Sequence, residues 1–320
     1  MEGRTRGFYL LSVNKNALKI VEEMMDNKDE IGVDIFNLKN GTAIVDAGAK
    51  VSGGLKAGVY FSRACMGGLG DVSLWVGQRV EVDVFTDHPA IVCMGAQFCG
   101  WRISVGDYVG MGSGPARALA LVEKKLYDDI KYKDEFDKAV IALETRKFPD
   151  EKVADFIAMK CGIDSKNLYI LVAPTASIVG SIQISARVVE TGIHKMHEMG
   201  FDLAKVVSGG GSAPIAPVAK NDLEAMGRTN DCILYGGRTQ YFVNAEDSEI
   251  EKIIEDIPSC SSKDYGTPFL EIFEKCGRDF YKIDSKLFSP AEVVVSNIKT
   301  GSIFHAGGIN EKILAKSLGI

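Results

Sequence analysis

Two different periods of apolar and polar residues run along this chain, and its first fifty residues show both. Between residues 14 and 27, apolar side chains recur every three or four positions, which predicts an amphipathic helix. Residues 33–36 and 42–45 alternate with a period of two around Asn40-Gly41, a pair typical of a tight hairpin turn. We therefore expect a helix followed by a β-hairpin at the start of the chain.

The same two periods continue to the end of the chain. Strands are predicted at 72–76, 80–85, 90–94, 139–143, 168–173, 231–236, 240–245 and 292–298, and one more ends in the glycine-rich run 208–212. Helices are predicted around Arg63 and at 115–127, 150–161, 178–199, 248–256, 268–276 and 310–317. Helices that alternate with strands indicate an α/β protein, whereas hairpins bring antiparallel pairs into its sheets. The pattern predicts an α/β fold with mixed sheets.

The length of the chain fits two domains of this kind. A chain of 320 residues is long for one simple core. Residues 131–138 are rich in charge and read as a linker, and the strand and helix pattern restarts after Gly162. We expect a short N-terminal extension at 1–10, a first α/β domain at 11–160 and a second at 161–320, with segments that can interleave.

Composition and charge narrow the class of partner. The chain is 46% hydrophobic and 25% charged, as globular proteins are. Its net charge of −6, without basic runs, argues against nucleic acid as a partner. Apolar runs are far shorter than the ~20 residues of a membrane span, and the N-terminus has no apolar signal-peptide core. A cytoplasmic protein with no membrane partner is expected.

The cysteines and histidines do not form a recognisable metal-binding pattern. There are seven cysteines, an odd number, and they are widely scattered. This favours reduced thiols in a cytosol rather than a disulfide framework. None of the four histidines belongs to an array of zinc ligands, which would need three or four converging groups. We therefore expect no metal site.

A single pair of opposite charges stands out in the stretch from Leu168 to Gly192. Arg187 and Glu190 are the only charged residues there, and on a helix their spacing of three puts them on one face. One interpretation is an ordinary helix ion pair. The other is a buried or cleft position in which Glu190 is a general base and Arg187 sets its ionised state and orientation.

Two segments rich in glycine and serine are candidates for ligand binding. In Gly110-Met111-Gly112-Ser113-Gly114-Pro115-Ala116-Arg117, backbone N–H groups, the Ser113 hydroxyl and Arg117 would converge on an anion at a helix start. The alternative is a tight turn that needs glycine. The segment from Ser208 to Pro214 lacks a basic residue, and Gly209 and Gly210 could let a flat ligand approach the backbone.

From about Leu11 to its C-terminus, the chain resembles methenyl-tetrahydromethanopterin cyclohydrolases. The resemblance rests on Ser12-Val13-Asn14-Lys15, Asn40-Gly41-Thr42, the segment Gly110–Ala118, Arg187-Val188-Val189-Glu190-Thr191 and Gly200-Phe201-Asp202. These motifs are specific in combination.

This resemblance implies two α/β domains with a deep cleft between them, a homotrimer, and a role in the one-carbon metabolism of methanogenesis. It implies hydrolysis of the cyclic amidinium of 5,10-methenyltetrahydromethanopterin, a pterin, to the 5-formyl form without a metal or redox cofactor. In that family an arginine and a glutamate three residues apart serve the chemistry, and Arg187 and Glu190 occupy the matching positions. The carrier's phosphate-bearing tail would then be a ligand for Gly112, Ser113 and Arg117.

Two other functions stay open on the sequence alone. One is another pterin one-carbon enzyme, such as a formyltransferase, which would need a second substrate pocket. The other is a carrier-binding protein without activity, in which Arg187 and Glu190 merely pair.

Overall fold

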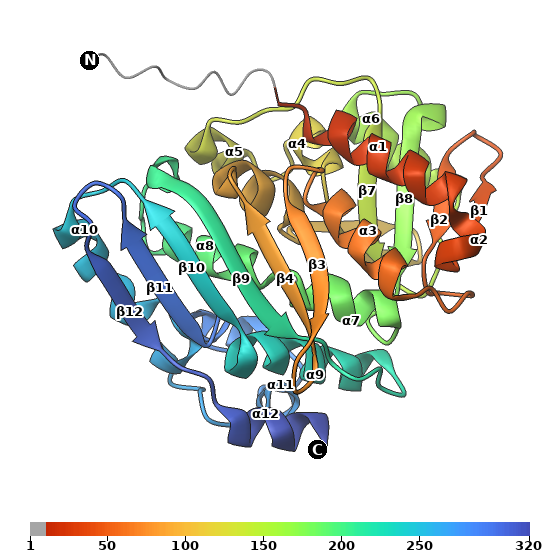
Figure 1. Ribbon diagram of the computed structural model, residues 1–320. Coiled ribbons are helices and arrows are strands. Elements are labelled where there is room, and N and C mark those ends of the chain that lie inside the picture. The colour runs from red at the N-terminus through yellow and green to blue at the C-terminus, as the bar shows by residue number, and fades with distance from the viewer. Residues whose placement is uncertain (1–10) are drawn as a thin grey trace, which may run out of the picture.

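The computed structural model describes residues 11–320, which form two six-stranded sheets (Figure 1). In order across the first sheet, its strands are β1 (Asp34–Asn37), β2 (Ala43–Asp46), β8 (Leu168–Ala173), β7 (Ala139–Glu144), β6 (Tyr108–Ser113) and β5 (Trp101–Val105). Strands β2, β8 and β7 are parallel, and the outer pairs are antiparallel. The predicted hairpin around Asn40-Gly41 is confirmed as β1 and β2.

The second sheet is also mixed. Its order is β12 (Ile303–Gly307), β11 (Glu292–Asn297), β10 (Arg238–Val243), β9 (Val206–Pro214), β4 (Val80–Thr86) and β3 (Asp71–Val76). Only β10 and β11 are parallel, and every other neighbouring pair is antiparallel. Two mixed sheets with helices confirm the predicted α/β class.

Helices cover both faces of the first sheet. In the view of Figure 1, α1 (Val13–Asp26) and α3 (Leu55–Cys65) lie in front of it, and α4 (Ala116–Ala120) and α6 (Glu151–Cys161) lie behind it. Successive side chains of β8 point to opposite faces, so Leu171 packs with α1 and α3 while Ile170 packs with α6. This half is a three-layer sandwich, and its central strands are apolar on both sides.

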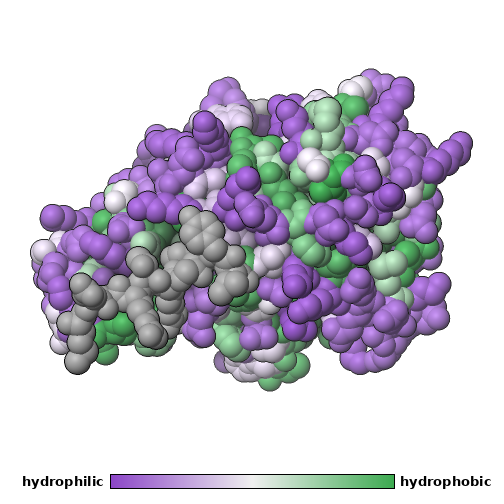
Figure 2. Space-filling view, turned by 90° about the horizontal axis from the view of Figure 1, so that it is seen from above, coloured by the Kyte–Doolittle hydropathy of each residue, from purple (hydrophilic) through white to green (hydrophobic). Residues whose placement is uncertain are grey.

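The second sheet has one covered face. Helix α8 (Val188–Glu198) packs against one side of it, and the strands expose alternate residues on the other. Trp75, Phe85 and Phe242 are partly exposed on this open face. Seen from above, hydrophilic side chains cover most of the visible face of the molecule, with hydrophobic patches between them (Figure 2). None of the helices within residues 11–320 is long and apolar enough to cross a membrane.

The other helices are short or lie beside the sheets. They are α2 (Lys28–Ile31), α5 (Lys124–Ile130), α7 (Ile178–Ser185), α9 (Asp222–Gly236), α10 (Asp247–Glu251), α11 (Phe269–Lys275) and α12 (Glu311–Leu318). Single 3₁₀ turns occur at Ser165–Asn167, Leu203–Lys205, Ile254–Asp256, Ser259–Ser261, Phe280–Lys282 and Ser285–Leu287. Helices α9, α11 and α12 share an apolar core of their own beside the second sheet.

Two of the predicted strands are wrong, for the same reason. Residues 90–94 belong to a π-helix, Ala90–Gln97, and residues 231–236 form the last turns of α9. Both runs consist almost wholly of buried residues, and the pattern of a short buried run does not distinguish a strand from a helix. Conversely, β5, β6 and β12 were not predicted.

The sheets draw strands from both parts of the chain. Strands β3 and β4 precede residue 160 but belong to the second sheet, and β8 follows it but belongs to the first. The interleaving that the sequence analysis allowed thus describes the sheets, whereas the domain boundary at 160 stays a prediction. The expected extension at 1–10 lies outside the described residues.

Helix α8 approaches the second sheet unusually closely at Gly192. A Cβ atom on Gly192 would lie 2.1 Å from the Tyr241 hydroxyl oxygen, and that hydroxyl donates a hydrogen bond of 2.9 Å to the Val189 carbonyl. On the sheet side, a Cβ on Gly209 or Gly211 would come within 3.3 Å of the Val189 side chain. Glycines on both surfaces therefore set the depth at which α8 lies.

We expect Gly192→Ala to destabilise the protein. The gain in helix propensity, about 1 kcal/mol, opposes an overpacking cost of about 1–3 kcal/mol. Tyr241→Phe removes the oxygen that the new methyl group would meet, so the double variant should lose less than the sum of the two single losses. Urea unfolding of the four proteins measures this coupling, and strictly additive losses would contradict the packing argument.

Candidate active site

Arg187 and Glu190 lie at a junction between two helices rather than within one. The single helix predicted at 178–199 is wrong, because the chain leaves α7 at Ala186 and enters α8 at Val188. Arg187 is the N-cap residue of α8, and its N–H donates to the Ile184 carbonyl at 2.9 Å. Glu190 follows in the first turn of α8.

The guanidinium of Arg187 is buried and is held by uncharged acceptors. Its Nε and Nη2 donate to Gln183 Oε1 at 3.2 and 3.0 Å, and Nη2 also donates to Ser113 Oγ at 3.0 Å. Its Nη1 donates to the carbonyl of Gln97, the last residue of the π-helix. These bonds come from three separate segments and fix the plane of the guanidinium.

Within residues 11–320, Arg187 has no carboxylate at ion-pair distance, and the Glu190 side chain makes neither a hydrogen bond nor an ion pair. The ordinary helix ion pair is therefore excluded, and so is direct orientation of Glu190 by Arg187. Glu190 is only 5% exposed. Its carboxyl is thus a buried acid with no partner within the described part of the chain.

This environment shifts the acidity of Glu190. Burial raises the pKa of its carboxyl to about 7, and the positive charges of Arg187 and Arg117 partly oppose that rise. Its place in the first turn of α8 also favours the ionised form, because the N-terminal end of a helix is electropositive. A carboxyl with a pKa near neutrality can both accept and return a proton at working pH.

A chain of polar side chains anchors Arg187 from behind. Glu144, at the end of β7, accepts a hydrogen bond from Thr175 Oγ1 at 2.5 Å and one from Gln183 Nε2 at 3.3 Å. Because Gln183 Nε2 donates to Glu144, the Oε1 atom of the same amide points to Arg187 and accepts its hydrogen bonds. Sequence reasoning missed both residues, although Gln183 precedes Arg187 by one helical turn and Glu144 directly follows an apolar strand.

Three cysteine thiols lie near this cluster without the properties of nucleophiles. The Cys65 Sγ lies 3.9 Å from Ser113 Oγ. Burial raises the pKa of Cys99 to about 11 and raises the pKa of Cys65 and of Cys93. Because the thiolate is the reactive form, all three stay inert thiols at neutral pH. The seven cysteines are unpaired in the structure.

The candidate anion loop has a different structure from the one predicted. Gly112 and Ser113 belong to strand β6, and the following helix α4 is only five residues long. A Cβ on Gly112 would lie 3.1–3.2 Å from Ile103 and Ile141, so this glycine serves core packing. Ser113 is 3% exposed and holds Arg187.

The guanidinium of Arg117 faces the interior, where its Nε and Nη1 atoms donate hydrogen bonds and its Nη2 atom makes only an ion-pair contact. It has no exposed surface, pairs with Glu123 at 3.0 Å and donates to the carbonyls of Met94 and Ala96 at 3.1 Å. Phe98 lies against it, with the ring centroid 5.2 Å away. These internal bonds and the lack of exposed surface favour a structural role for Arg117, and a phosphate contact at this residue stays a prediction.

Gly209 and Gly210 also lie in a strand rather than in a loop. Both belong to β9, between β4 and β10. Gly209 faces Tyr241 and Val189, where its missing side chain admits α8. Gly210 points to the opposite side of the sheet, away from Glu190. A ligand contact at these two glycines stays a prediction, and a cleft at Arg187 and Glu190 does so too.

Comparison with known proteins identifies close relatives over almost the whole chain. The family model described as "Cyclohydrolase (MCH)" matches residues 12–318. Proteins named methenyltetrahydromethanopterin cyclohydrolase from several methanogens are similar to this chain. The one from Methanocaldococcus jannaschii is 49% identical over 97% of this chain and 99% of its own length. Those from Methanococcus vannielii and Methanosarcina barkeri are each 46% identical over 97% of this chain and 98% and 99% of their own.

The raised pKa of Glu190 predicts a stability effect with a definite sign. Its carboxyl is more easily protonated in the folded protein, so its stabilising contribution is complete below about pH 4.5 and is lost as the pH rises through about 7. Glu190→Gln keeps the neutral form at every pH. The variant should therefore gain stability over the native protein between pH 5 and pH 8, by at most about 3 kcal/mol.

Urea unfolding at the two pH values measures this difference. Glu22→Gln, at an exposed glutamate of α1, is the matched control and should differ from the native protein equally at both. If Glu190→Gln behaves as this control does, Glu190 is not a buried acid with a raised pKa.

Proposed function

The chain belongs to the methenyltetrahydromethanopterin cyclohydrolase family, and we propose that Glu190 is the base that activates water in its reaction. As a member of this family, it is a hydrolase that acts on a carbon–nitrogen bond of a cyclic amidine. Its proposed reaction turns 5,10-methenyltetrahydromethanopterin into the 5-formyl form, as a step of one-carbon metabolism in methanogenesis. Family membership argues against a formyltransferase and against a carrier-binding protein without activity.

Hydrolysis of a cyclic amidinium requires few catalytic groups from the protein. Its bridging carbon is electrophilic already, because it shares the positive charge with two nitrogens. The reaction needs a water molecule held on one face of that carbon and a base to accept the water's proton. The single observation that carries our proposal is the buried, unpartnered carboxyl of Glu190, whose pKa of about 7 suits this task.

The proton balance assigns Glu190 two successive roles. It accepts one proton as the water oxygen bonds to the amidinium carbon, which gives a neutral carbinol. The carbinol then opens to the formyl group, as its hydroxyl proton leaves and one carbon–nitrogen bond breaks. Protonated Glu190 returns its proton to the departing nitrogen. The sum is one water consumed and one proton released to the solvent.

Arg187 would act on Glu190 through space. Its charge lowers the pKa of the Glu190 carboxyl and so keeps part of it ionised at neutral pH. The same charge repels a cationic substrate, and Glu144 and Glu190 supply the compensating negative charges. Since Gln183, Ser113 and the Gln97 carbonyl fix the guanidinium, it cannot swing onto Glu190 without losing these bonds.

Three further properties belong to the same proposal. We propose that no metal or redox cofactor takes part, because the amidinium carbon needs no Lewis acid. We also propose a homotrimer, in which contacts between subunits would cover the exposed apolar residues on the open face of the second sheet, Trp75, Phe85, Phe242 and Ile303. A cytoplasmic location is supported by seven unpaired thiols.

Glu190→Gln tests the role of the base. The amide keeps the shape of the side chain but cannot accept a proton from water at neutral pH. Loss of a general base typically costs about 10²–10⁴ in rate, so kcat should fall by that factor while the dissociation constant of the substrate changes little. The loss of absorbance of the methenyl form measures turnover. Glu22→Gln should keep native turnover, and near-native turnover of folded Glu190→Gln would refute the assignment.

The pH profile tests the role of Arg187. In the hydrolytic direction the ionised carboxylate is the active form, so kcat should rise with pH and level off above a midpoint near 7. Arg187→Ala removes a charge that lowers this pKa, so the midpoint should move to higher pH. Arg102→Ala, at an exposed arginine on β5, is the control and should leave the midpoint in place. An unchanged midpoint in Arg187→Ala would show that the charge of Arg187 does not tune the pKa of the base.

A further inference from the structure

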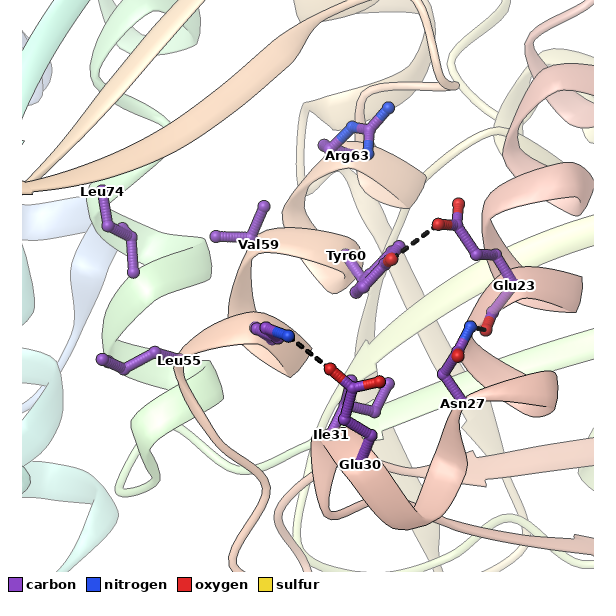
Figure 3. Close-up of a pocket in the computed structure, with 10 residues that line it drawn as sticks. Glu23, Asn27, Glu30, Ile31, Leu55, Val59, Tyr60, Arg63 and Leu74 are labelled. Carbon is purple, nitrogen blue, oxygen red and sulfur yellow. Dashed lines mark hydrogen bonds and ion pairs between the residues drawn. The ribbon is translucent and has the colours of Figure 1, made fainter.

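A hollow of about 470 Å³ opens on the side of α3 that faces α1, α2 and β3 (Figure 3). It is lined by Glu23 and Asn27 of α1, Glu30 and Ile31 of α2, Leu55, Lys56, Val59, Tyr60 and Arg63 of α3, and Leu74 of β3. The opposite side of α3 packs on α7, where Gly58 meets Ile182. Helix α3 therefore stands between this hollow and the helix that carries Gln183.

Arg63 is the unusual residue of the hollow. Its Nε atom is buried and has no hydrogen-bond partner, and within residues 11–320 its guanidinium makes no ion pair. Figure 3 shows it at one end of the hollow, with no dashed line to any neighbour. A buried N–H of a charged group that lacks an acceptor is costly, because it has lost water without a replacement.

The other charged groups of the hollow already have partners. Lys56 is hydrogen-bonded to Glu30, and the Tyr60 hydroxyl donates to Glu23 at 2.6 Å. Lys56 and Arg63 balance Glu23 and Glu30, so the lining is neutral overall. Since none of the other lining residues accepts a hydrogen bond from Arg63, its acceptor comes from outside the lining, and an anionic acceptor gives the strongest pairing with a guanidinium.

An apolar wall faces this unpaired charge. Leu55 and Leu74 line one side of the hollow, opposite Glu23, Asn27 and Glu30 (Figure 3). Leu55 is 53% exposed, and Val59 lies beside Leu74. A ligand with a hydrocarbon or ring body would cover this wall while its charged end pairs with Arg63.

We propose that this hollow is a second binding site, which takes a small anion, a carboxylate or a phosphate monoester, on an apolar body. The anion pairs with Arg63 in the fork geometry of guanidinium and oxyanion, and the body packs on Leu55, Val59 and Leu74. The site does not depend on the reaction proposed for Glu190, which lies on a different helix.

Phenyl phosphate is the probe that combines both features. Titration of the native protein, followed by ligand NMR, should give saturable binding in the millimolar range or tighter. Inorganic phosphate lacks the ring and phenol lacks the charge, so both should bind more weakly. Arg63→Met keeps the length of the side chain and removes its charge, and it should weaken phenyl phosphate binding by about tenfold or more.

Three further variants make the result specific. Arg102→Met makes the same change at an exposed arginine outside the hollow and should leave binding unchanged. Leu55→Ser should weaken phenyl phosphate binding but leave that of inorganic phosphate unchanged. Glu190→Gln should bind the probe as the native protein does, even if it is inactive. Equal losses in Arg63→Met and Arg102→Met, or no saturable binding to the native protein, would overturn the proposal.

Discussion

Helix α8 packs its first two turns directly against strand β9, and this contact places Arg187 and Glu190 inside the protein. The contact is possible because Gly192 makes room for Tyr241 and because β9 carries glycines where Val189 arrives. The burial of these two side chains then determines their acidity and their hydrogen-bond partners. A carboxyl that is largely removed from water without gaining a partner binds its proton more tightly, and a guanidinium at the same depth is stabilised by hydrogen-bond acceptors from other segments.

The sequence predicted the elements that have a clear local periodicity, whereas its predictions failed for segments that are buried on all sides. The hairpin at Asn40-Gly41 and the amphipathic helix α1 have clear periods, and both were predicted. The runs at 90–94 and 231–236 carry no period because they are buried on all sides. Neither proline nor glycine marks the break at Arg187, since the break is stabilised by tertiary bonds to Gln97 and Ser113.

In the candidate site, too, some residues could be identified from the local sequence and others only from the fold. Arg187 and Glu190 were identifiable because they are the only charges in a long apolar stretch. Glu144 was not, because it reaches Gln183 across 39 residues of sequence, and only the sheet brings the two together. The glycine-rich segments misled for a related reason. A glycine lets a neighbouring helix or strand come close to the backbone as readily as it lets a ligand do so. At Gly112 and Gly209 the close neighbours are side chains of the protein.

Three arginines illustrate how pairing, rather than sequence motif, separates structure from function. Arg117 lies in the most motif-like segment, yet its guanidinium is buried and bonded to Glu123 and two backbone carbonyls. Arg187 is satisfied by neutral acceptors, so its charge is not cancelled and extends to Glu190. Arg63 has no acceptor within the described chain and borders a hollow. Arg117 is paired with a carboxylate inside the protein, the charge of Arg187 acts on Glu190, and the guanidinium of Arg63 borders a hollow where a ligand can pair with it.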